Sequence, residues 1–156
     1  MTVADVVTIR PEDPRQRDVR ALIAELDELM ARLYPAESNH LVDVDALAGP
    51  DVRFVVARQL ERAVGCGAVV RRDGQLGEIK RMYVDPRVRG RGLGRQLLEA
   101  LQAEAAKQGL RRLALETGVS QSEAIGLYRR AGFRDCPPFG SYKPDPLSLF
   151  MMKELV

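Results

Sequence analysis

The segment from Val84 to Leu98 constrains the fold of this chain most strongly, because the character of the sequence changes twice within it. A strand-like apolar stretch ends at Val84, a turn rich in glycine and arginine follows, and leucines at helical spacing come next. Gly90, Gly92 and Gly94 lack the Cβ atom that would hold an anion away from the backbone N–H groups. The N-terminus of the helix adds partial positive charge. The segment therefore predicts a strand, an anion-binding turn and a helix in succession.

Glycine spacing narrows the class of anion that this turn can bind. A dinucleotide-binding Gly-x-Gly-x-x-Gly that begins at Gly90 would need a third glycine where Arg95 stands. A Walker loop would need Gly-Lys followed by Ser or Thr, which the chain lacks. Arg89, Arg91 and Arg95 surround the turn with full positive charge. Neither nucleotide fingerprint fits, and taken alone the turn could also be a solvated loop with a basic rim.

Composition favours a single domain with an ordinary core. The 156 residues are 46% hydrophobic, which is enough for one substantial core. The 24 basic and 22 acidic side chains give a net charge of only +2, so we expect no nucleic-acid partner. No apolar run is long enough for a bilayer and the N-terminus lacks the form of a signal peptide, so we expect a cytoplasmic protein without a membrane partner. The two cysteines, Cys66 and Cys136, lack metal-type spacing; we expect no metal site, and we expect Cys66 to be buried.

The periodicity of apolar residues predicts a chain that begins and ends with strands. Strands are predicted at residues 6–9, 52–60, 63–71, 77–84, 113–116, 133–136 and 147–155. Helices are predicted at residues 14–33 and 44–48, from the glycine turn to Gly109, and at residues 122–131. The three strands between residues 52 and 84 are expected to form an antiparallel meander.

The pattern Arg89-x-x-Gly92-x-Gly94, entered from Met82-Tyr83-Val84-Asp85-Pro86, resembles the coenzyme A pyrophosphate loop of the GNAT N-acetyltransferase superfamily. The order of predicted elements is also similar to that of GNAT enzymes along the whole chain. The resemblance implies one α+β domain, residues 1–156, with a mixed, mostly antiparallel sheet flanked by helices and a V-shaped splay between the fourth and fifth strands. It implies acetyl-CoA as acyl donor, with contacts from Met82, Tyr83, Val84, Arg89, Gly90, Arg91, Gly92, Leu93, Gly94, Arg95, Gln121 and Tyr128.

The resemblance implies that the strand that enters the glycine turn binds the pantetheine arm of the coenzyme through the backbone of Met82 and Val84. Because side chains alternate along a strand, we expect those of Met82 and Val84 on the face that carries Glu78 and Lys80. Glu78 matches the place where several GNAT members have a glutamate that acts as a base, directly or through water. The alternative is a cross-strand ion pair with Lys80 or with the neighbours of Arg81, and the residues do not decide between the two readings.

A second segment, Gln121 to Phe133, resembles the GNAT pattern Asn-x-x-Ala-x-x-x-Tyr followed by a basic stretch and Gly-Phe. Ala124 and Tyr128 fall at the matching places, and Gln121 stands where asparagine is commoner. The resemblance implies that Tyr128 donates a proton or hydrogen bond to the sulfur of the leaving thiolate. A phenol suits this role because its ordinary pKa, about 10, keeps it protonated at neutral pH.

The acceptor site is predicted from charged residues in loops and at strand ends. Carboxylates at Glu37 and Glu116 would suit a cationic amine. His40 lies in the loop that borders the acceptor pocket in GNAT folds, and binding groups favour loops. Residues 142–145 are further candidates for contacts with the acceptor.

The resemblance implies direct transfer of an acetyl group from acetyl-CoA to the primary amine of a small molecule or amino acid, and less readily of a peptide. Cys66 and Cys136 match no family nucleophile, so no covalent enzyme intermediate is expected. An acceptor that bears a carboxylate would be held by Arg32 or Arg81, and this choice stays open. The alternatives are a non-catalytic acyl-CoA-binding regulatory module and a nucleic-acid contact, which the small net charge disfavours. A homodimer is compatible with the resemblance, since many relatives are dimers.

Overall fold

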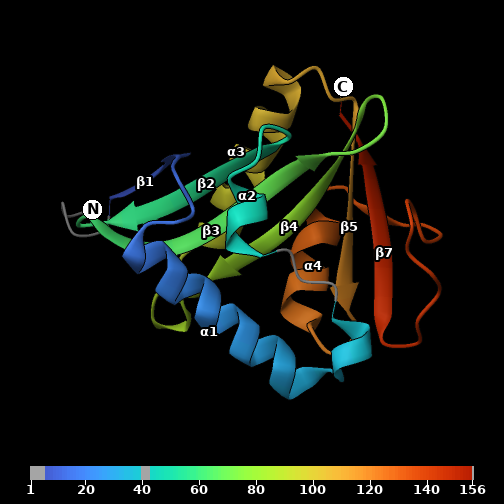
Figure 1. Cartoon of the computed structure of the whole chain (residues 1–156), viewed down its shortest axis with the longest axis horizontal. Coiled ribbons are helices and arrows are strands. Elements are labelled where there is room, and N and C mark those ends of the chain that lie inside the picture. The colour runs from blue at the N-terminus through green and yellow to red at the C-terminus, as the bar shows by residue number, and fades with distance from the viewer. Residues whose placement is uncertain (1–5, 40–42, 156) are drawn as a thin grey trace.

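A mixed sheet in the order β1-β2-β3-β4-β5-β7-β6 forms the centre of the computed structural model, which describes residues 6–39 and 43–155 (Figure 1). Within these residues the sheet has seven strands, and all neighbours are antiparallel except β4 and β5. The predicted order of strands and helices and the α+β class are confirmed. The strands are β1 (Val7–Pro11), β2 (Val52–Gln59), β3 (Arg62–Arg71), β4 (Leu76–Val84), β5 (Arg112–Gly118), β6 (Arg134–Asp135) and β7 (Ser148–Glu154). The helices are α1 (Arg17–Leu33), η2 (Ala36–Ser38), α2 (Val44–Leu47), η3 (Pro86–Val88), α3 (Leu93–Lys107) and α4 (Ser122–Arg130).

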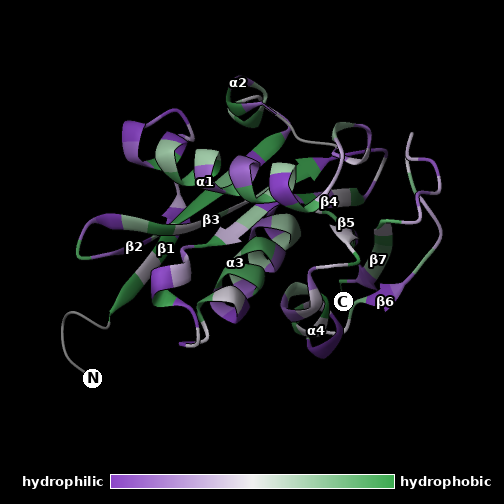
Figure 2. Ribbon diagram, turned by 90° about the horizontal axis from the view of Figure 1, so that it is seen from below, coloured by the Kyte–Doolittle hydropathy of each residue, from purple (hydrophilic) through white to green (hydrophobic). Residues whose placement is uncertain are grey.

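Helices cover both faces of the sheet, with α1 and α2 on one side and α3 and α4 on the other (Figure 2). Each face has its own apolar core, and each large side chain withdrawn from water contributes about 1.5–3 kcal/mol. The buried residues of α1 are Val19, Leu22, Ile23, Leu26 and Met30. Those of α3 are Leu93, Leu97, Leu98, Leu101 and Ala105.

Two glycines of β3 allow α3 to lie close to the sheet. A Cβ atom on Gly65 would lie 2.9 Å from Leu97 Cδ1, and one on Gly67 would lie 2.8 Å from Leu101 Cδ1. Real Cβ atoms do not approach carbon this closely, so each glycine provides the space that one leucine fills. The position of α3, and with it the position of the glycine turn at its N-terminus, therefore depends on Gly65 and Gly67.

A β-bulge interrupts β4 at Arg81. Tyr83 pairs with Cys66 and Lys80 pairs with Ala68, so two residues of β4 lie opposite the single residue between Cys66 and Ala68. Arg81 has a φ of 57°, which few residues other than glycine adopt. The buried thiol of Cys66 donates a hydrogen bond to the Arg81 carbonyl oxygen at 3.3 Å and so supports the bulge.

The bulge reverses which side chains of β4 share a face. Met82 and Val84 pack against the core on the α3 side. Lys80 pairs with a residue of the α1-side core, and Ile79 between Glu78 and Lys80 belongs to the α3-side core. The prediction that Met82 and Val84 share a face with Glu78 and Lys80 is therefore wrong, because one extra residue shifts the alternation.

The splay predicted between the fourth and fifth strands is present. The parallel pairing of β4 and β5 runs from Leu76 and Arg112 to Ile79 and Leu115. Beyond this point both strands continue without pairing to each other, β4 to Val84 and β5 to Gly118. Figure 1 shows the two arrows diverging toward their C-terminal ends. The sheet thus opens beside the start of the glycine turn.

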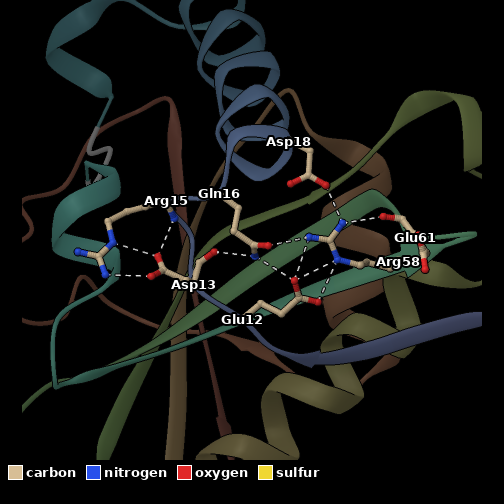
Figure 3. A network of polar contacts seen from close by, with 7 residues as sticks. All are labelled: Glu12, Asp13, Arg15, Gln16, Asp18, Arg58 and Glu61. Carbon is tan, nitrogen blue, oxygen red and sulfur yellow. Dashed lines mark hydrogen bonds and ion pairs between the residues drawn. The ribbon is translucent and has the colours of Figure 1, made fainter.

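A polar network around Arg58 fixes the beginning of α1 against the sheet (Figure 3). The Arg58 guanidinium donates to Glu12, which follows β1, at 3.0 and 3.1 Å, and to Asp18 in the first turn of α1 at 2.6 Å. It also donates to the Glu61 carbonyl oxygen at 2.8 Å. Because α1 lines part of the splay, this network contributes to the shape of the opening.

The predicted element boundaries differ from the observed ones by a few residues. The predicted helix 14–33 begins at Arg17 instead, because the Asp13 carboxylate accepts the Arg15 N–H at 2.8 Å and holds the chain in a turn. The predicted strand 133–136 is reduced to β6. The predicted helix after the glycine turn is α3, which ends at Lys107. Gly109 follows it with a φ of 76°, as expected of a glycine that terminates a helix.

Candidate functional site

A cleft runs through the sheet where β4 and β5 separate. Its walls come from α1, Tyr34, η2 and Asn39, the C-terminal halves of β4 and β5, the start of β7, and α4. Leu26 and Met30 belong to the core on the α1 face, whereas Ile79 and Leu115 belong to the core on the α3 face. The cleft is therefore lined by side chains from both faces of the sheet.

The glycine turn lies at the N-terminus of α3 and leaves open space around its backbone. Gly90 and Gly92 have φ of 82° and 76°, and nothing lies within 4 Å of a Cβ built on either residue. Gly92 is the N-cap of α3 and provides no side chain to accept the first N–H groups of the helix. Arg91 and Arg95 are exposed beside the turn, where Arg95 forms an ion pair with Glu99 at 3.4 Å. A phosphate group would fit this cradle of amides and positive charge.

The entry to the glycine turn is held by Asp85, which the sequence analysis did not single out. Its buried carboxylate accepts the Arg87 N–H at 2.9 Å and forms ion pairs with Arg62 at 3.1 Å and Arg87 at 2.9 Å. The hydrogen bond from the Arg87 side chain lowers the pKa of Asp85, so the carboxylate stays ionised. An aspartate before a proline was the available sequence signal, since it is typical of a turn.

The end of β4 offers an unpaired edge to the cleft. The Asp85 N–H donates to the Val64 carbonyl oxygen at 2.9 Å, and backbone groups alternate along a strand, so those of Val84 point away from β3. Arg89 Nε donates to the Val84 carbonyl oxygen at 3.2 Å, and its guanidinium lies 5.7 Å from the centre of the Tyr83 ring. The Tyr83 side chain itself is buried in the α1-side core. An extended ligand could pair with this edge as a further strand would.

Tyr128 extends from α4 into the cleft. Its side chain is 7% exposed, its hydroxyl lies 3.9 Å from Met82 Sδ, and its ring contacts Phe133 edge-on. Burial raises the pKa of Tyr128 to about 12, so the phenol keeps its proton at any physiological pH. The cleft therefore contains a fixed proton donor on the side that faces α3 and α4.

The turn from β5 into α4 closes the end of the cleft. Gln121 Oε1 accepts the Gly118 N–H at 3.0 Å and the Tyr34 hydroxyl at 3.4 Å, and that hydroxyl accepts the Ser120 N–H at 3.2 Å. A Cβ on Gly118 would lie 1.7 Å from the Tyr34 oxygen, so the tyrosine fits only against a glycine. Tyr34 was not predicted; a tyrosine directly after the apolar face of a helix was its only sequence signal.

On the α1 face the cleft carries charge of both signs. Lys80, whose side chain is 10% exposed, donates to the Tyr142 hydroxyl at 2.7 Å. Burial lowers the pKa of Lys80, although the charges of Glu78 and Glu116 act in the opposite direction. Arg81 forms an ion pair with Asp27 of α1, and Glu116 accepts a hydrogen bond from the Ser148 hydroxyl at 2.8 Å. Lys80, Arg81 and Glu116 all line the cleft.

Residues 19–133 match the model of the Acetyltransferase (GNAT) family. The chain belongs to this family. The IAA acetyltransferase of Azospirillum brasilense is 55% identical over 96% of this GNAT chain and 98% of its own length. A crystal structure from Klebsiella pneumoniae, provisionally named an acyl-CoA N-acyltransferase, is 38% identical, with a TM-score of 0.83 over 97% of this chain and 99% of that one. The PaiA N-acetyltransferase of Thermoplasma acidophilum, solved with coenzyme A, has the same fold at 17% identity and a TM-score of 0.71, over 96% of this chain and 99% of that one.

In this GNAT acetyltransferase, the predicted coenzyme residues form two neighbouring groups. The glycine turn and its arginines lie together at the start of α3, and Met82, Gln121 and Tyr128 lie together in the cleft. Gln121 holds the turn before α4 through its side chain, so its amide already has a structural role. Among the residues that the structure describes, no group of three or more His, Cys, Asp and Glu could hold a metal ion, and no helix is long and apolar enough to cross a membrane.

Glu78 lies away from the cleft. It is 1% exposed, and its carboxylate accepts hydrogen bonds from Arg72 Nε at 2.9 Å and the Tyr142 hydroxyl at 2.6 Å. Lys80 Nζ lies 3.5 Å from the same carboxylate. An ion pair of Glu78 with Lys80 is thus present, although both residues lie on β4 and the pair does not cross between strands. A part for Glu78 as base stays a prediction that would have to act through these neighbours.

Among the predicted acceptor residues that the structure describes, Glu116 and Arg81 line the cleft and the others do not. Glu37 is exposed in η2, and the two residues after it line the cleft instead. His40 lies outside the described residues. Arg32 is exposed near the end of α1 and is not part of the cleft wall, whereas Arg81 is.

Proposed function

We propose that this GNAT acetyltransferase transfers the acetyl group of acetyl-CoA directly to the primary amine of a small molecule. The observation that carries the proposal is the Tyr128 hydroxyl, which lies in the cleft where β4 and β5 separate, beside the open glycine turn of α3. The IAA acetyltransferase of Azospirillum brasilense, similar over nearly the whole chain, supports an acetyl donor.

The donor site follows from the two open features beside the cleft. The amides of Gly90, Gly92 and the first turn of α3, with the nearby arginines, would hold the pyrophosphate. The free edge of β4 from Met82 to Val84 would hold the pantetheine arm. When bound, acetyl-CoA supplies a thioester whose sulfur becomes the leaving group. The Thermoplasma protein, which has the same fold, was solved in complex with coenzyme A, which supports coenzyme A as the class of ligand.

Two groups of the chain would handle protons in the cleft. Tyr128, protonated because of its burial, would donate its hydroxyl proton or a hydrogen bond to the sulfur. Glu116, a carboxylate in the cleft wall, would accept a hydrogen bond from the acceptor ammonium and hold the amine near the opening. Glu78 could receive the proton of the amine only through Lys80, which lines the cleft and contacts Glu78 both directly and through the Tyr142 hydroxyl.

Tyr128→Phe tests the proposal in an assay that follows thiol release from acetyl-CoA with a panel of small amines. The wild type should turn over at least one amine. The variant should bind acetyl-CoA with unchanged affinity and turn over the amine about 100-fold more slowly, because it lacks the proton donor. Saturable acetyl-CoA binding without turnover of any amine would instead identify a regulatory module, and an unchanged rate would remove Tyr128 from the mechanism.

A further inference from the structure

We propose that the acceptor is an α-amino acid, whose carboxylate binds to Lys80 and Arg81 and whose amine lies against Glu116. The inference rests on the proposed function and names the substrate class of the same site. Two kinds of acceptor are chemically possible for this cleft: an amine without a negative charge, and an amine that also bears a carboxylate. The inference selects the second kind.

The three charged side chains line the cleft at the point where β4 and β5 separate. Ile79 and Leu115 are the last residues that pair between β4 and β5, and Lys80 and Glu116 directly follow them. Both side chains lie on the face opposite to Ile79 and Leu115, which belong to the α3-side core. The charge of Glu116 acts on the Lys80 ammonium, as expected for groups on neighbouring strands. A small molecule at this point would therefore meet charges of both signs.

The ammonium of Lys80 is held in place from behind. It donates to the Tyr142 hydroxyl at 2.7 Å, which donates in turn to Glu78 at 2.6 Å. Arg72 forms an ion pair with the same carboxylate at 2.7 Å. Because a buried charge is costly unless it is paired, this support allows a cation that is 10% exposed to remain in the wall of the cleft.

Arg81 presents a second supported cation. Its side chain is 5% exposed, and its guanidinium pairs with Asp27 of α1. Neither Asp27 nor Glu78, the carboxylate behind Lys80, is part of the cleft wall. Among the described residues that line the cleft, the charged ones are thus two cations and one carboxylate.

This distribution of charge fits an amino acid better than a simple amine. A protonated amine alone would meet Lys80 and Arg81 as like charges, which is unfavourable in a partly buried site. An α-amino acid brings a carboxylate to these cations and an ammonium to Glu116, with no change in net charge. Hydrogen bonds between charged partners are about twice as strong as neutral ones, so the carboxylate should contribute much of the affinity.

Matched acceptors and matched variants test the inference. Each α-amino acid of a panel is compared with its own α-carboxamide, which keeps the side chain and the amine but loses the negative charge. The amine of the carboxamide is less basic, so any preference for the acid runs against intrinsic reactivity. For the preferred amino acid, kcat/KM should be at least about tenfold higher than for its carboxamide.

Lys80→Met should lower the ratio of kcat/KM for the amino acid to kcat/KM for its carboxamide about tenfold, mainly through the KM of the amino acid. Because Lys80 also contacts Glu78, any effect on proton transfer is common to both acceptors and cancels in this ratio. Lys80→Arg should restore most of the preference, and Lys107→Met, on an exposed lysine of α3, should retain it fully. Thermal unfolding with coenzyme A present gives a second readout: the amino acid should raise Tm for the wild type but not for Lys80→Met.

Equal turnover of acids and carboxamides, or a preference that survives Lys80→Met, would overturn the inference while leaving the proposed function intact. Absence of thiol release with every acceptor, together with a Lys80-dependent rise in Tm on addition of an amino acid, would support the inference and count against acetyl transfer. Absence of both signals would contradict the two proposals together.

Discussion

Tyr128 connects the burial of a single side chain to the chemistry of the cleft. The α4 helix places its hydroxyl next to Met82, at the inner end of the opening between β4 and β5. The same burial that positions the phenol also keeps it protonated, because the charged phenolate would lose its hydration. Burial therefore determines the protonation state of this residue, and its effect can be measured without any substrate.

The alkaline stability of the protein should report the raised pKa of Tyr128. The folded pKa, about 12, lies above the ordinary value of 10, so the stabilisation is complete below pH 10 and is lost as the pH rises toward 12. Between pH 9 and pH 11 the wild type should lose about 1.4 kcal/mol more free energy of unfolding than Tyr128→Phe. Urea unfolding at each pH measures the difference, and the other tyrosines are common to both proteins. Parallel pH profiles would show that the phenol is not desolvated.

The positions of residues were predictable where they depend on spacing along the chain. Tyr128 and the glycines of the turn were identified from their distance to neighbours in sequence, and the structure places Tyr128 in the cleft wall and the glycines at the start of α3. The side chains around Arg81 were not predictable, because the left-handed conformation of this arginine shifts the alternation of β4. No residue type marks such a bulge, since arginine seldom adopts this conformation.

At the scale of elements, contact between α3 and β3 determines where the anion-binding turn lies. Apolar periodicity was sufficient to predict both elements, and their order was confirmed. The distance between α3 and β3 depends on two glycines. In the sequence these glycines are seen only as interruptions of an apolar strand. The structure shows that Gly65 and Gly67 lie under leucines of α3. Such complementarity between distant segments cannot be inferred from either segment alone.

Gly67→Ala should destabilise the protein by about 1–3 kcal/mol, because the new methyl group would overlap Leu101 Cδ1. Leu101→Ala alone should cost about 2–5 kcal/mol through the cavity that it leaves. The double variant should be more stable than the sum of the single effects predicts, since the two changes occupy the same space. Denaturant unfolding measures the coupling.

Gly126→Ala is the matched control for this cycle. Its Cβ would meet the end of the flexible Arg130 side chain, 3.1 Å away, and α4 favours alanine over glycine. We expect no loss of stability from this change. Strict additivity between Gly67→Ala and Leu101→Ala would contradict the close approach of α3 to the sheet.

At the scale of the whole molecule, the cleft between β4 and β5 is lined by residues of both apolar cores. The glycine turn and Tyr128 lie with the core on the α3 side, and Lys80 and Glu116 face the α1 side. The two sides of the cleft therefore differ in chemistry, with the phenol on the α3 side and the charged groups on the α1 side. The splay was predicted from the resemblance to the GNAT superfamily, whereas the distribution of charge within it emerged from long-range contacts with Asp27 and Tyr142.

The most direct test of this account is calorimetric titration of acetyl-CoA into the wild type, Gly92→Ala and Gly74→Ala. Both glycines have positive φ and open space around them, so the substitutions impose similar local strain. Only Gly92 lies at the N-terminus of α3, where a methyl group would keep a phosphate from the backbone. We predict saturable binding to the wild type, about tenfold or more weaker binding to Gly92→Ala, and unchanged binding to Gly74→Ala. Absence of binding to the wild type, or equal affinity of all three proteins, would contradict the account.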